Sequence, residues 1–188
     1  MPQAVLFDLD GVLVDTYTVW EHLLNDLARR LGYPAIDPDK YRSAWGQGIE
    51  ADVEAFYPRH TIEEMRQLYA VHYEDHLGHL RVMDGAREML DSLAIPKAVV
   101  TNSPIALARR ALRITRLEPY FGAVVGCDEV PRSKPAPDML FEACRRLGVD
   151  PTETLMVGDS DFDEEAACAA RIAFVRFRSF ADLHLEKK

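Results

Sequence analysis

Two aspartates, Asp8 and Asp10, follow a short apolar run at residues 4–7, and Gly11 comes directly after them. On an extended backbone their i, i+2 spacing turns both side chains toward one face of the strand's end. Two carboxylates held so close together require a cation between them or a shared proton. Mg²⁺ prefers carboxylate oxygens and usually keeps positions free for water and phosphate oxygens. The pair therefore indicates metal-assisted phosphoryl or acyl transfer, although an acidic surface turn after a strand has the same pattern.

A turn later in the chain offers groups that could hold an anion. Thr101, Asn102 and Ser103 follow a β-branched run. We expect Ser103 to cap a helix that starts at Pro104, which would leave backbone N–H groups free for an anion. Hydroxyl, amide and N–H donors at a helix start suit a phosphate group.

A lysine and further carboxylates complete the set. Lys134 precedes Pro135, which disfavours helical backbone at the lysine and so fixes it in a loop. Asp159 and Asp163 follow another apolar run. Each cluster alone has a structural explanation, such as a helix cap, a proline-rich loop or an acidic helix start. Their occurrence together, in this order, favours one functional site.

The clusters lie where short apolar runs give way to amphipathic segments. The pattern predicts strands at residues 3–8, 97–101, 123–125, 154–157 and 173–175, and helices at residues 85–93, 104–113, 137–147 and 161–170. Such alternation is typical of βαβ units, and we expect an α/β fold with a parallel sheet. Ligands bind these sheets beyond the carboxyl ends of the strands, which is where the clusters stand.

Residues 16–80 interrupt this alternation because their apolar positions recur only at helical spacing. The predicted elements are a helix at 19–31, irregular helical turns at 37–58 and a helix at 61–77. A single sheet that includes the first strand then requires residues 16–80 to be an inserted helical domain. Residues 1–15 and 81–188 would together form the core domain.

Composition restricts the possible partners. The 188 residues are 48% hydrophobic with a net charge of −9, as in a globular chain without a basic block. This balance argues against nucleic acid or an anionic membrane as a partner. No run is long enough to span a membrane, and we expect no signal peptide. Three scattered cysteines, Cys127, Cys144 and Cys168, favour buried, reduced thiols in a cytoplasmic protein.

In its motifs the chain resembles the haloacid dehalogenase superfamily of phosphohydrolases, above all its phosphoglycolate phosphatase and β-phosphoglucomutase branch. The matching segments are DLDGVLVD at 8–15, VTNS at 100–103, SKPAPD at 133–138 and VGDS at 157–160 with Asp163. They occur in the family's order, and the likeness covers about residues 4–177. It implies a Rossmann-like three-layer core with a helical cap at 16–80. It also implies an Mg²⁺-dependent phosphatase that acts on a small phosphorylated metabolite through an aspartyl phosphate.

The resemblance assigns catalytic and metal-binding roles by position. Asp8 would be the nucleophile, and Asp10 would protonate the leaving alcohol and then deprotonate the attacking water. Mg²⁺ would be held by the Asp8 side chain, the Asp10 backbone carbonyl and Asp159. Asp163 would orient this metal site from behind.

The resemblance also assigns phosphate-binding roles. Thr101 and the Asn102 backbone would hold the oxygens of the transferring phosphoryl group, with Ser103 in the same turn. Lys134 would bridge Asp8 and the phosphate. Charge spread over phosphoryl oxygens is what such donors stabilise best.

Two sets of residues in the predicted cap are further candidates. Trp45 and Gly46 are predicted to belong to a loop that reads the substrate, with core packing as an equal alternative. His72, His76 and His79 have the i, i+4, i+7 spacing of a possible metal face, but partly buried or interface histidines are the favoured interpretation.

Several details separate the possible activities. Asp10 argues against a dehalogenase, because that sister branch lacks the second aspartate. Mutases of this type have a histidine early in the cap helix, where this chain has Trp20, with His22 nearby. A phosphatase is therefore favoured, and the alternatives are a phosphomutase or a catalytically weak phosphate-binding or regulatory protein.

The chain departs from the branch in a short cap and in Ala170-Arg171, where Ala-Gly is usual. We expect a monomer or weak homodimer.

Overall fold

The computed structural model describes residues 2–183. Its main sheet has five parallel strands in the order β5-β4-β1-β6-β7, and two short antiparallel strands, β2 and β3, form a second sheet. The strands are β1 (Ala4–Phe7), β2 (Val14–Asp15), β3 (Arg81–Val82), β4 (Lys97–Thr101), β5 (Ala123–Gly126), β6 (Thr154–Gly158) and β7 (Ala173–Arg176). The α-helices are α1 (Tyr17–Arg30), α2 (Pro38–Ala44), α3 (Ile49–Phe56), α4 (Ile62–His72), α5 (Ala86–Ser92), α6 (Ile105–Ile114), α7 (Asp138–Leu147) and α8 (Asp161–Ala170). The 3₁₀ turns are η1 (Tyr73–His79), η2 (Glu118–Tyr120), η3 (Cys127–Glu129) and η4 (Pro151–Glu153). None of the helices within residues 2–183 combines the length and the apolarity that crossing a membrane requires.

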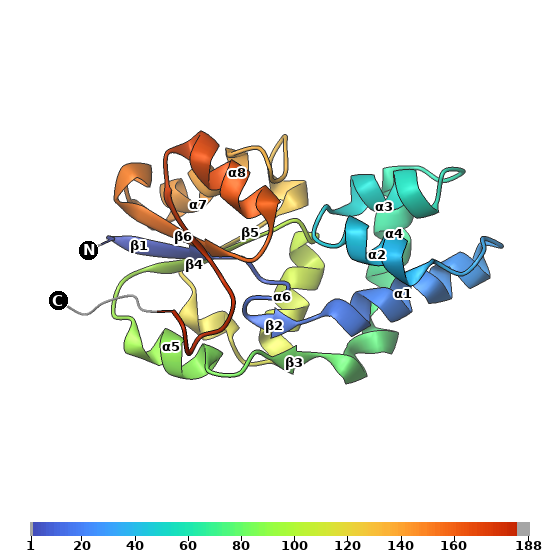
Figure 1. Cartoon of the computed structure of the whole chain (residues 1–188), viewed down its shortest axis with the longest axis horizontal. Coiled ribbons are helices and arrows are strands. Elements are labelled where there is room, and N and C mark those ends of the chain that lie inside the picture. The colour runs from blue at the N-terminus through green and yellow to red at the C-terminus, as the bar shows by residue number, and fades with distance from the viewer. Residues whose placement is uncertain (1, 184–188) are drawn as a thin grey trace.

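The central strand β1 is buried on both faces of the sheet. Its side chains alternate, so that Val5 and Phe7 enter one apolar cluster while Leu6 enters another. Helices α5 and α6 cover the first face, and α7 and α8 cover the second (Figure 1). The α/β fold with a Rossmann-like three-layer core is thereby confirmed.

Helices α1–α4 and the turn η1 form a helical unit beside this core. In sequence they lie between β2 and β3, and in space they face the carboxyl ends of the central strands (Figure 1). The unit has an apolar cluster that Leu107 of α6 also joins, and to which α1 contributes Val19, Leu23 and Leu27 at helical spacing. Val14 pairs with Val82, so the chain leaves and re-enters the core at adjacent positions.

The predicted helix over residues 61–77 is too long. Helix α4 begins with the expected capping box but ends at His72, and the chain continues as the 3₁₀ turn η1. Such turns often tighten the end of an α-helix. Here Tyr73 at the start of η1 packs against Trp20, with ring centroids 5.4 Å apart. The three histidines of this region therefore do not share one α-helical face.

The predicted burial of the cysteines is correct for two of the three. Cys127 and Cys144 are buried, but Cys168 is exposed. Helix α8 turns Ala166, Ala167 and Ala170 toward the sheet. Residue 168 lies on the opposite side of the helix, so the prediction that Cys168 is buried is wrong.

Candidate active site

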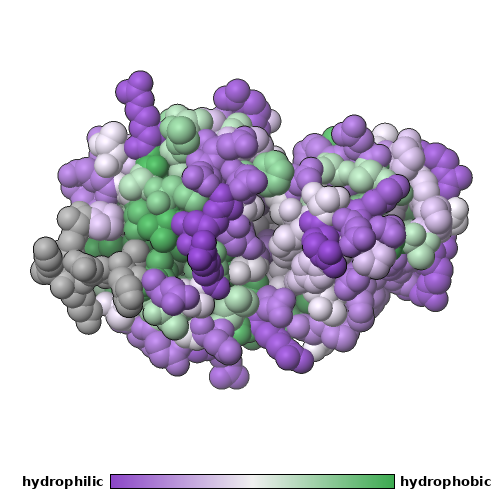
Figure 2. All heavy atoms as spheres, in the orientation of Figure 1, coloured by the Kyte–Doolittle hydropathy of each residue, from purple (hydrophilic) through white to green (hydrophobic). Residues whose placement is uncertain are grey.

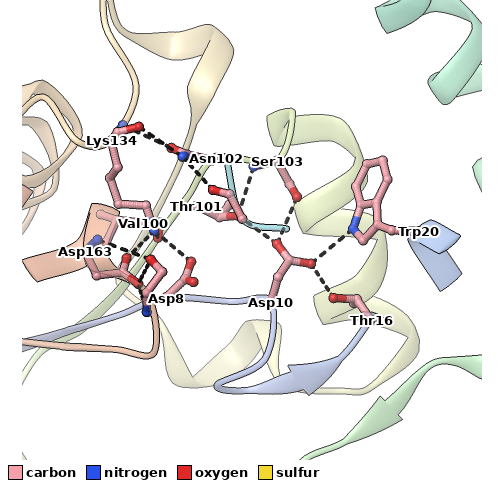
Figure 3. A network of polar contacts seen from close by, with 12 residues as sticks. Asp8, Asp10, Thr16, Trp20, Val100, Thr101, Asn102, Ser103, Lys134 and Asp163 are labelled. Atoms are coloured by element: carbon pink, nitrogen blue, oxygen red, sulfur yellow. Dashed lines mark hydrogen bonds and ion pairs between the residues drawn. The ribbon is translucent and has the colours of Figure 1, made fainter. Parts of the chain in front are cut away.

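Four polar clusters converge at the carboxyl ends of the central strands. Strand β1 leads into Asp8, β4 ends at Thr101, and β6 leads into Asp159. Lys134 comes from the loop before α7, where its peptide bond to Pro135 is cis. Because β4 and β6 flank β1, these segments lie side by side. One site thus receives residues from all four segments (Figure 3).

Lys134 lies at the centre of a buried ion cluster. Its Nζ donates to Asp8 Oδ1 at 2.9 Å, to Asp163 Oδ1 at 2.6 Å and to the Val100 carbonyl at 3.1 Å. The lysine side chain is only 2% exposed. Burial alone would lower the pKa of Lys134, but the carboxylates of Asp163 and Asp8 raise it above its ordinary value. The lysine therefore stays charged and holds the Asp8 carboxylate in place.

Asp163 has both carboxylate oxygens engaged by protein groups. One oxygen accepts from Lys134, and the other accepts from the backbone N–H and the hydroxyl of Ser160. The Ser160 hydroxyl in turn accepts from the Asp163 N–H, which makes a reciprocal cap at the start of α8. Asp163 is fully buried. This geometry suits a residue that positions Lys134 from behind.

Three carboxylates surround a place that suits a divalent cation. Asp8, Asp159 and Asp163 offer oxygens that all lie within 4.8 Å of one another. Burial, and next the charge of Asp163, raise the pKa of Asp8 well above its usual range and that of Asp159 to about 6. Lys134 supplies one positive charge against three negative ones, so a further cation is favoured here. Gly11 (φ +82°) passes so close that a Cβ would lie 2.4 Å from Asp159 Oδ2. This hard, crowded oxygen set fits Mg²⁺.

The Asp10 carboxylate lies apart from that cluster, in a ring of four donors. Thr16 Oγ1 and Trp20 Nε1 donate to Oδ1 at 2.6 and 3.3 Å. Thr101 Oγ1 and Ser103 Oγ donate to Oδ2 at 3.0 and 2.9 Å (Figure 3). Two donors come from the start of the helical unit and two from the end of β4, so both parts of the molecule orient this carboxylate.

Ser103 does not cap α6, contrary to the sequence prediction. Pro104 occupies the N-cap position with extended backbone, and the helix starts one residue later at Ile105. The Ile105 N–H is bound instead by Asp128 Oδ1 at 2.8 Å. Local preference predicts the cap, but Asp10 takes the Ser103 hydroxyl because the sheet brings the two together.

Asn102 connects the core to the helical unit. Its amide nitrogen donates to the carbonyls of Gly46 and Lys134 at 3.0 and 3.1 Å. Its amide oxygen accepts from the Lys134 N–H at 3.0 Å. One side chain thus fixes the Lys134 loop and holds the loop after α2 over the site.

A cavity lies between the core and the helical unit, along the groove that separates the two parts in Figure 2. On the core side it is lined by Asp8, Asp10, Lys134 and the turn at residues 101–104. The helical side is mostly aromatic and apolar; it includes Trp20, Leu24, Tyr41, Trp45, Ile49 and Tyr69. Gly46 also lines the cavity.

Trp45 fits both interpretations that its sequence left open. It lines the cavity, and its ring also packs against Tyr17 and Tyr41, with centroids 5.0 and 5.9 Å apart. The packing is therefore observed, and a role of Trp45 in recognising the substrate stays a prediction.

The histidines of the helical unit lie elsewhere. His22 packs against His79 and His76, with ring centroids 4.5 and 6.5 Å apart, and His72 contacts Asp75 at the surface. None of these histidines lines the cavity within the described part of the chain.

A sequence model of the family described as "Haloacid dehalogenase-like hydrolase" matches residues 5–177. The chain belongs to this family. The prediction of a haloacid dehalogenase superfamily hydrolase is therefore confirmed.

Individual relatives within the superfamily support this assignment. The chain is 34% identical to a phosphoglycolate phosphatase of Chromobacterium violaceum over 92% of its own length and 83% of the relative's. It is 33% identical to an N-acetylmuramic acid 6-phosphate phosphatase of Pseudomonas aeruginosa, over 93% and 82%. The crystal structure of CbbY from Rhodobacter sphaeroides in complex with phosphate has the same fold, with a TM-score of 0.84 at 22% identity over 99% and 90% of the two chains.

Sequence reasoning missed two residues that the structure places at the site. Thr16 donates to Asp10, and Asp52 lines the cavity from α3. Thr16 and Trp20 have an i, i+4 spacing that could have indicated a shared face. For Asp52 the only signal is its place three residues after Ile49, on the inward side of a short helix.

Proposed function

We propose that the chain is an Mg²⁺-dependent phosphatase that hydrolyses a small phosphomonoester through an aspartyl phosphate on Asp8. The observation that carries this proposal is the Lys134 cluster, in which a buried lysine holds Asp8 at the edge of the cavity. A carboxylate that is fixed and partly neutralised is suited to attack an anionic phosphoryl group. The phosphatase names of the relatives agree with this activity.

Two displacements at phosphorus would complete the reaction. In the first, a carboxylate oxygen of Asp8 forms a bond to phosphorus while the bond to the leaving oxygen breaks, and Asp10 gives that oxygen a proton. In the second, Asp10 takes a proton from water, whose oxygen bonds to phosphorus as the Asp8–phosphorus bond breaks. Inorganic phosphate and the starting enzyme result. The hydroxyl groups of Thr16, Thr101 and Ser103 would keep Asp10 aimed at the apical oxygens.

The metal-binding residues in this proposal are Asp8, Asp159 and the backbone carbonyl of Asp10, with Asp163 positioning Lys134. Bound Mg²⁺ would neutralise charge on Asp8 and on the phosphoryl oxygens, so that the Asp8 carboxylate can approach the negatively charged phosphoryl group. Thr101 and the Asn102 backbone would bind the transferring phosphoryl group, and Lys134, whose three N–H groups are engaged by Asp8, Asp163 and the Val100 carbonyl, would stabilise it through its charge.

We assign the helical residues 16–80 as a cap domain over a core of residues 1–15 and 81–188. The supports are the apolar cluster of the helical unit, which only Leu107 among the described buried residues of the core helices joins, and the position of the unit over the cavity. In this assignment Trp45 and Gly46 contact the leaving group. Three unpaired cysteines fit a cytoplasmic enzyme, which we expect to act as a monomer or weak homodimer.

The phosphomutase alternative is less well supported by the cavity. Trp20 stands at the cavity where the mutases of this type have a histidine, and His22 packs against His79 away from it. A mutase must also exclude water from its phosphoenzyme. Decay of the phosphoenzyme in water without a sugar acceptor is the result expected for a phosphatase.

The proposal is tested by phosphate release from p-nitrophenyl phosphate with and without Mg²⁺. Turnover should require the metal. The Asp8→Asn variant should lose about 10³-fold or more in kcat, because the nucleophile is gone. Asp15→Asn, which changes an exposed aspartate of the same segment, is the matched control. Near-normal turnover by Asp8→Asn would remove Asp8 from this role.

A further inference from the structure

The helical wall of the cavity carries one carboxylate, at Asp52. Apart from it, the described residues on this wall are aromatic, aliphatic or glycine, as in Trp20, Tyr41 and Trp45. Asp52 lies in α3, whose neighbouring inward residues, Ile49 and Phe56, are buried. A leaving group attached to a phosphate at Asp8 would extend toward this wall.

Asp52 is held in place by a single phenol. Tyr69 donates its hydroxyl to Asp52 Oδ2 at 2.9 Å, and this is its only side-chain partner among the described residues. Burial raises the pKa of Asp52 to about 7, with the Tyr69 bond opposing and the charge of Glu50 adding to the shift. The other carboxylate oxygen therefore remains available for a donor in the cavity.

The cavity offers no free cation to a carboxylate on the leaving group. Lys134 is the one lysine or arginine that lines it within residues 2–183. That lysine already donates to Asp8, Asp163 and the Val100 carbonyl. A leaving group that ends in a carboxylate would be desolvated on the same side of the cavity as Asp52 with no cation to pair with, and such a charge is costly to bury.

We infer that this enzyme takes phosphomonoesters whose leaving group carries hydroxyl or amino groups and no carboxylate, with Asp52 as the acceptor that selects them. The inference rests on the proposed phosphatase function. Phosphoglycolate, the substrate in the name of the Chromobacterium violaceum relative, ends in a carboxylate and is therefore expected to be a poor substrate here.

The test compares phosphoglycolate with hydroxyethyl phosphate, which has the same two-carbon chain but ends in a hydroxyl group. At about pH 8, above the pKa of Asp52, kcat/KM of the wild type should favour hydroxyethyl phosphate at least ~10-fold, equal to about 1.4 kcal/mol. Asp52→Asn should reduce this ratio to about 3-fold or less, because it removes the repulsive charge. The change should appear mainly through faster turnover of phosphoglycolate.

Glu54→Gln is the matched control. It removes one negative charge from the same helix at an exposed position outside the cavity, so the wild-type ratio should be retained. If Asp52→Asn does not fold, Asp52→Ser serves as a second substitution. The ratio of the two kcat/KM values for the wild type tests the substrate preference without any variant.

The outcomes separate this inference from the proposed function. A wild type that prefers phosphoglycolate, or an Asp52→Asn variant with an unchanged ratio, overturns the choice of substrate class while the phosphatase stands. Absence of phosphate release from both esters and from p-nitrophenyl phosphate overturns the phosphatase and the inference together.

Discussion

At the scale of single residues, Lys134 supplies the positive charge that pairs with the carboxylates of Asp8 and Asp163. It is buried between Asp8 and Asp163, and every proton on its Nζ has an acceptor. Replacing it would leave two carboxylates facing each other without a cation. Removing one partner of a buried ion pair lowers the free energy of unfolding by far more than the intact pair contributes to it, because the remaining charge is buried alone.

Lys134→Met should therefore lower the free energy of unfolding by about 3–5 kcal/mol and abolish turnover. Urea denaturation measures the loss, with Lys40→Met as a control at an exposed lysine, where a change within about 0.5 kcal/mol is expected. The double variant Lys134→Met/Asp163→Asn should recover part of the stability, since one uncompensated charge is gone. Equal stability of the wild type and Lys134→Met would contradict this account of the cluster.

Asp52 should make stability depend on pH. Its pKa is raised from 3.8 to about 7 on folding, so the folded state binds the proton more tightly than the unfolded chain. Stability is therefore lost as pH rises from about 4 through 7, where the unfolded chain releases this proton first. Asp52→Asn removes that loss. The free energy of unfolding of Asp52→Asn, relative to the wild type, should rise by about 2–3 kcal/mol between pH 5 and pH 8 in urea titrations.

A pH-independent difference between Asp52→Asn and the wild type would mean that Asp52 is ionised in the folded state at both pH values. The titratable groups near it are Tyr69, which donates to it, Glu50, whose charge raises its pKa, and Tyr41 and Tyr57, whose pKa values its own charge raises. Both tyrosines have pKa values raised by burial, so neither titrates in this range.

At the scale of elements, the end of α8 is a point of backbone strain. Arg171 takes a left-handed conformation, with φ 57° and ψ 34°, where the family branch usually has glycine. A left-handed conformation costs a residue with a Cβ about 1–2 kcal/mol. The turn keeps its shape despite this cost, because the N–H groups of Arg171 and Ile172 are bound by α8 carbonyls.

Arg171→Gly should raise the free energy of unfolding by about 0.5–1 kcal/mol, since relief of strain exceeds the added freedom of the unfolded chain. Thermal and urea unfolding measure the effect, and kcat should not change. Gly148, a left-handed residue after α7, gives the reciprocal control, because Gly148→Ala should be destabilising by a similar amount. A less stable Arg171→Gly variant would show that the side chain contributes more than its strain costs.

The local sequence pattern predicts most of the helices and strands. It does not predict which side chains the polar residues at their ends bind. The sequence predicts the five strands of the main sheet to within one or two residues, because short apolar runs between glycine, proline and polar segments have few alternatives. It does not predict β2 and β3, because two residues are too few to show a strand pattern. The capping box at Thr61 was also visible in sequence. Ser103 was wrongly assigned to a cap because its true acceptor, Asp10, is 93 residues away. The Lys134–Asp163 pair was missed for the same reason.

At the scale of the whole molecule, the proposed function depends on the core and the helical unit meeting at one cavity. Asn102 on the core holds the Gly46 carbonyl of the helical unit, and Trp20 of the helical unit holds Asp10 of the core. On the face in Figure 2 the helical unit is largely hydrophilic. The cavity between the bodies is where side chains from both parts line one site.

Mg²⁺ should stabilise the whole molecule through the carboxylate cluster. At ten times its Kd the ion would add about 1.4 kcal/mol, which corresponds to a rise in Tm of about 3–6 °C. Asp159→Asn should lose this rise. Asp161→Asn, at an exposed carboxylate that pairs with Arg176, should keep it. An equal rise in Tm for Asp159→Asn and the wild type would place the metal elsewhere.

The proposed mechanism requires a covalent bond between Asp8 and phosphorus, which acid quenching of a single turnover can trap. The quenched protein should be heavier by the mass of one phosphoryl group, and borohydride reduction should convert residue 8 to homoserine. Asp8→Asn should show neither change, and Asp15→Asn should show both. Turnover at a normal rate with no phosphoryl group on residue 8 would contradict the proposed mechanism.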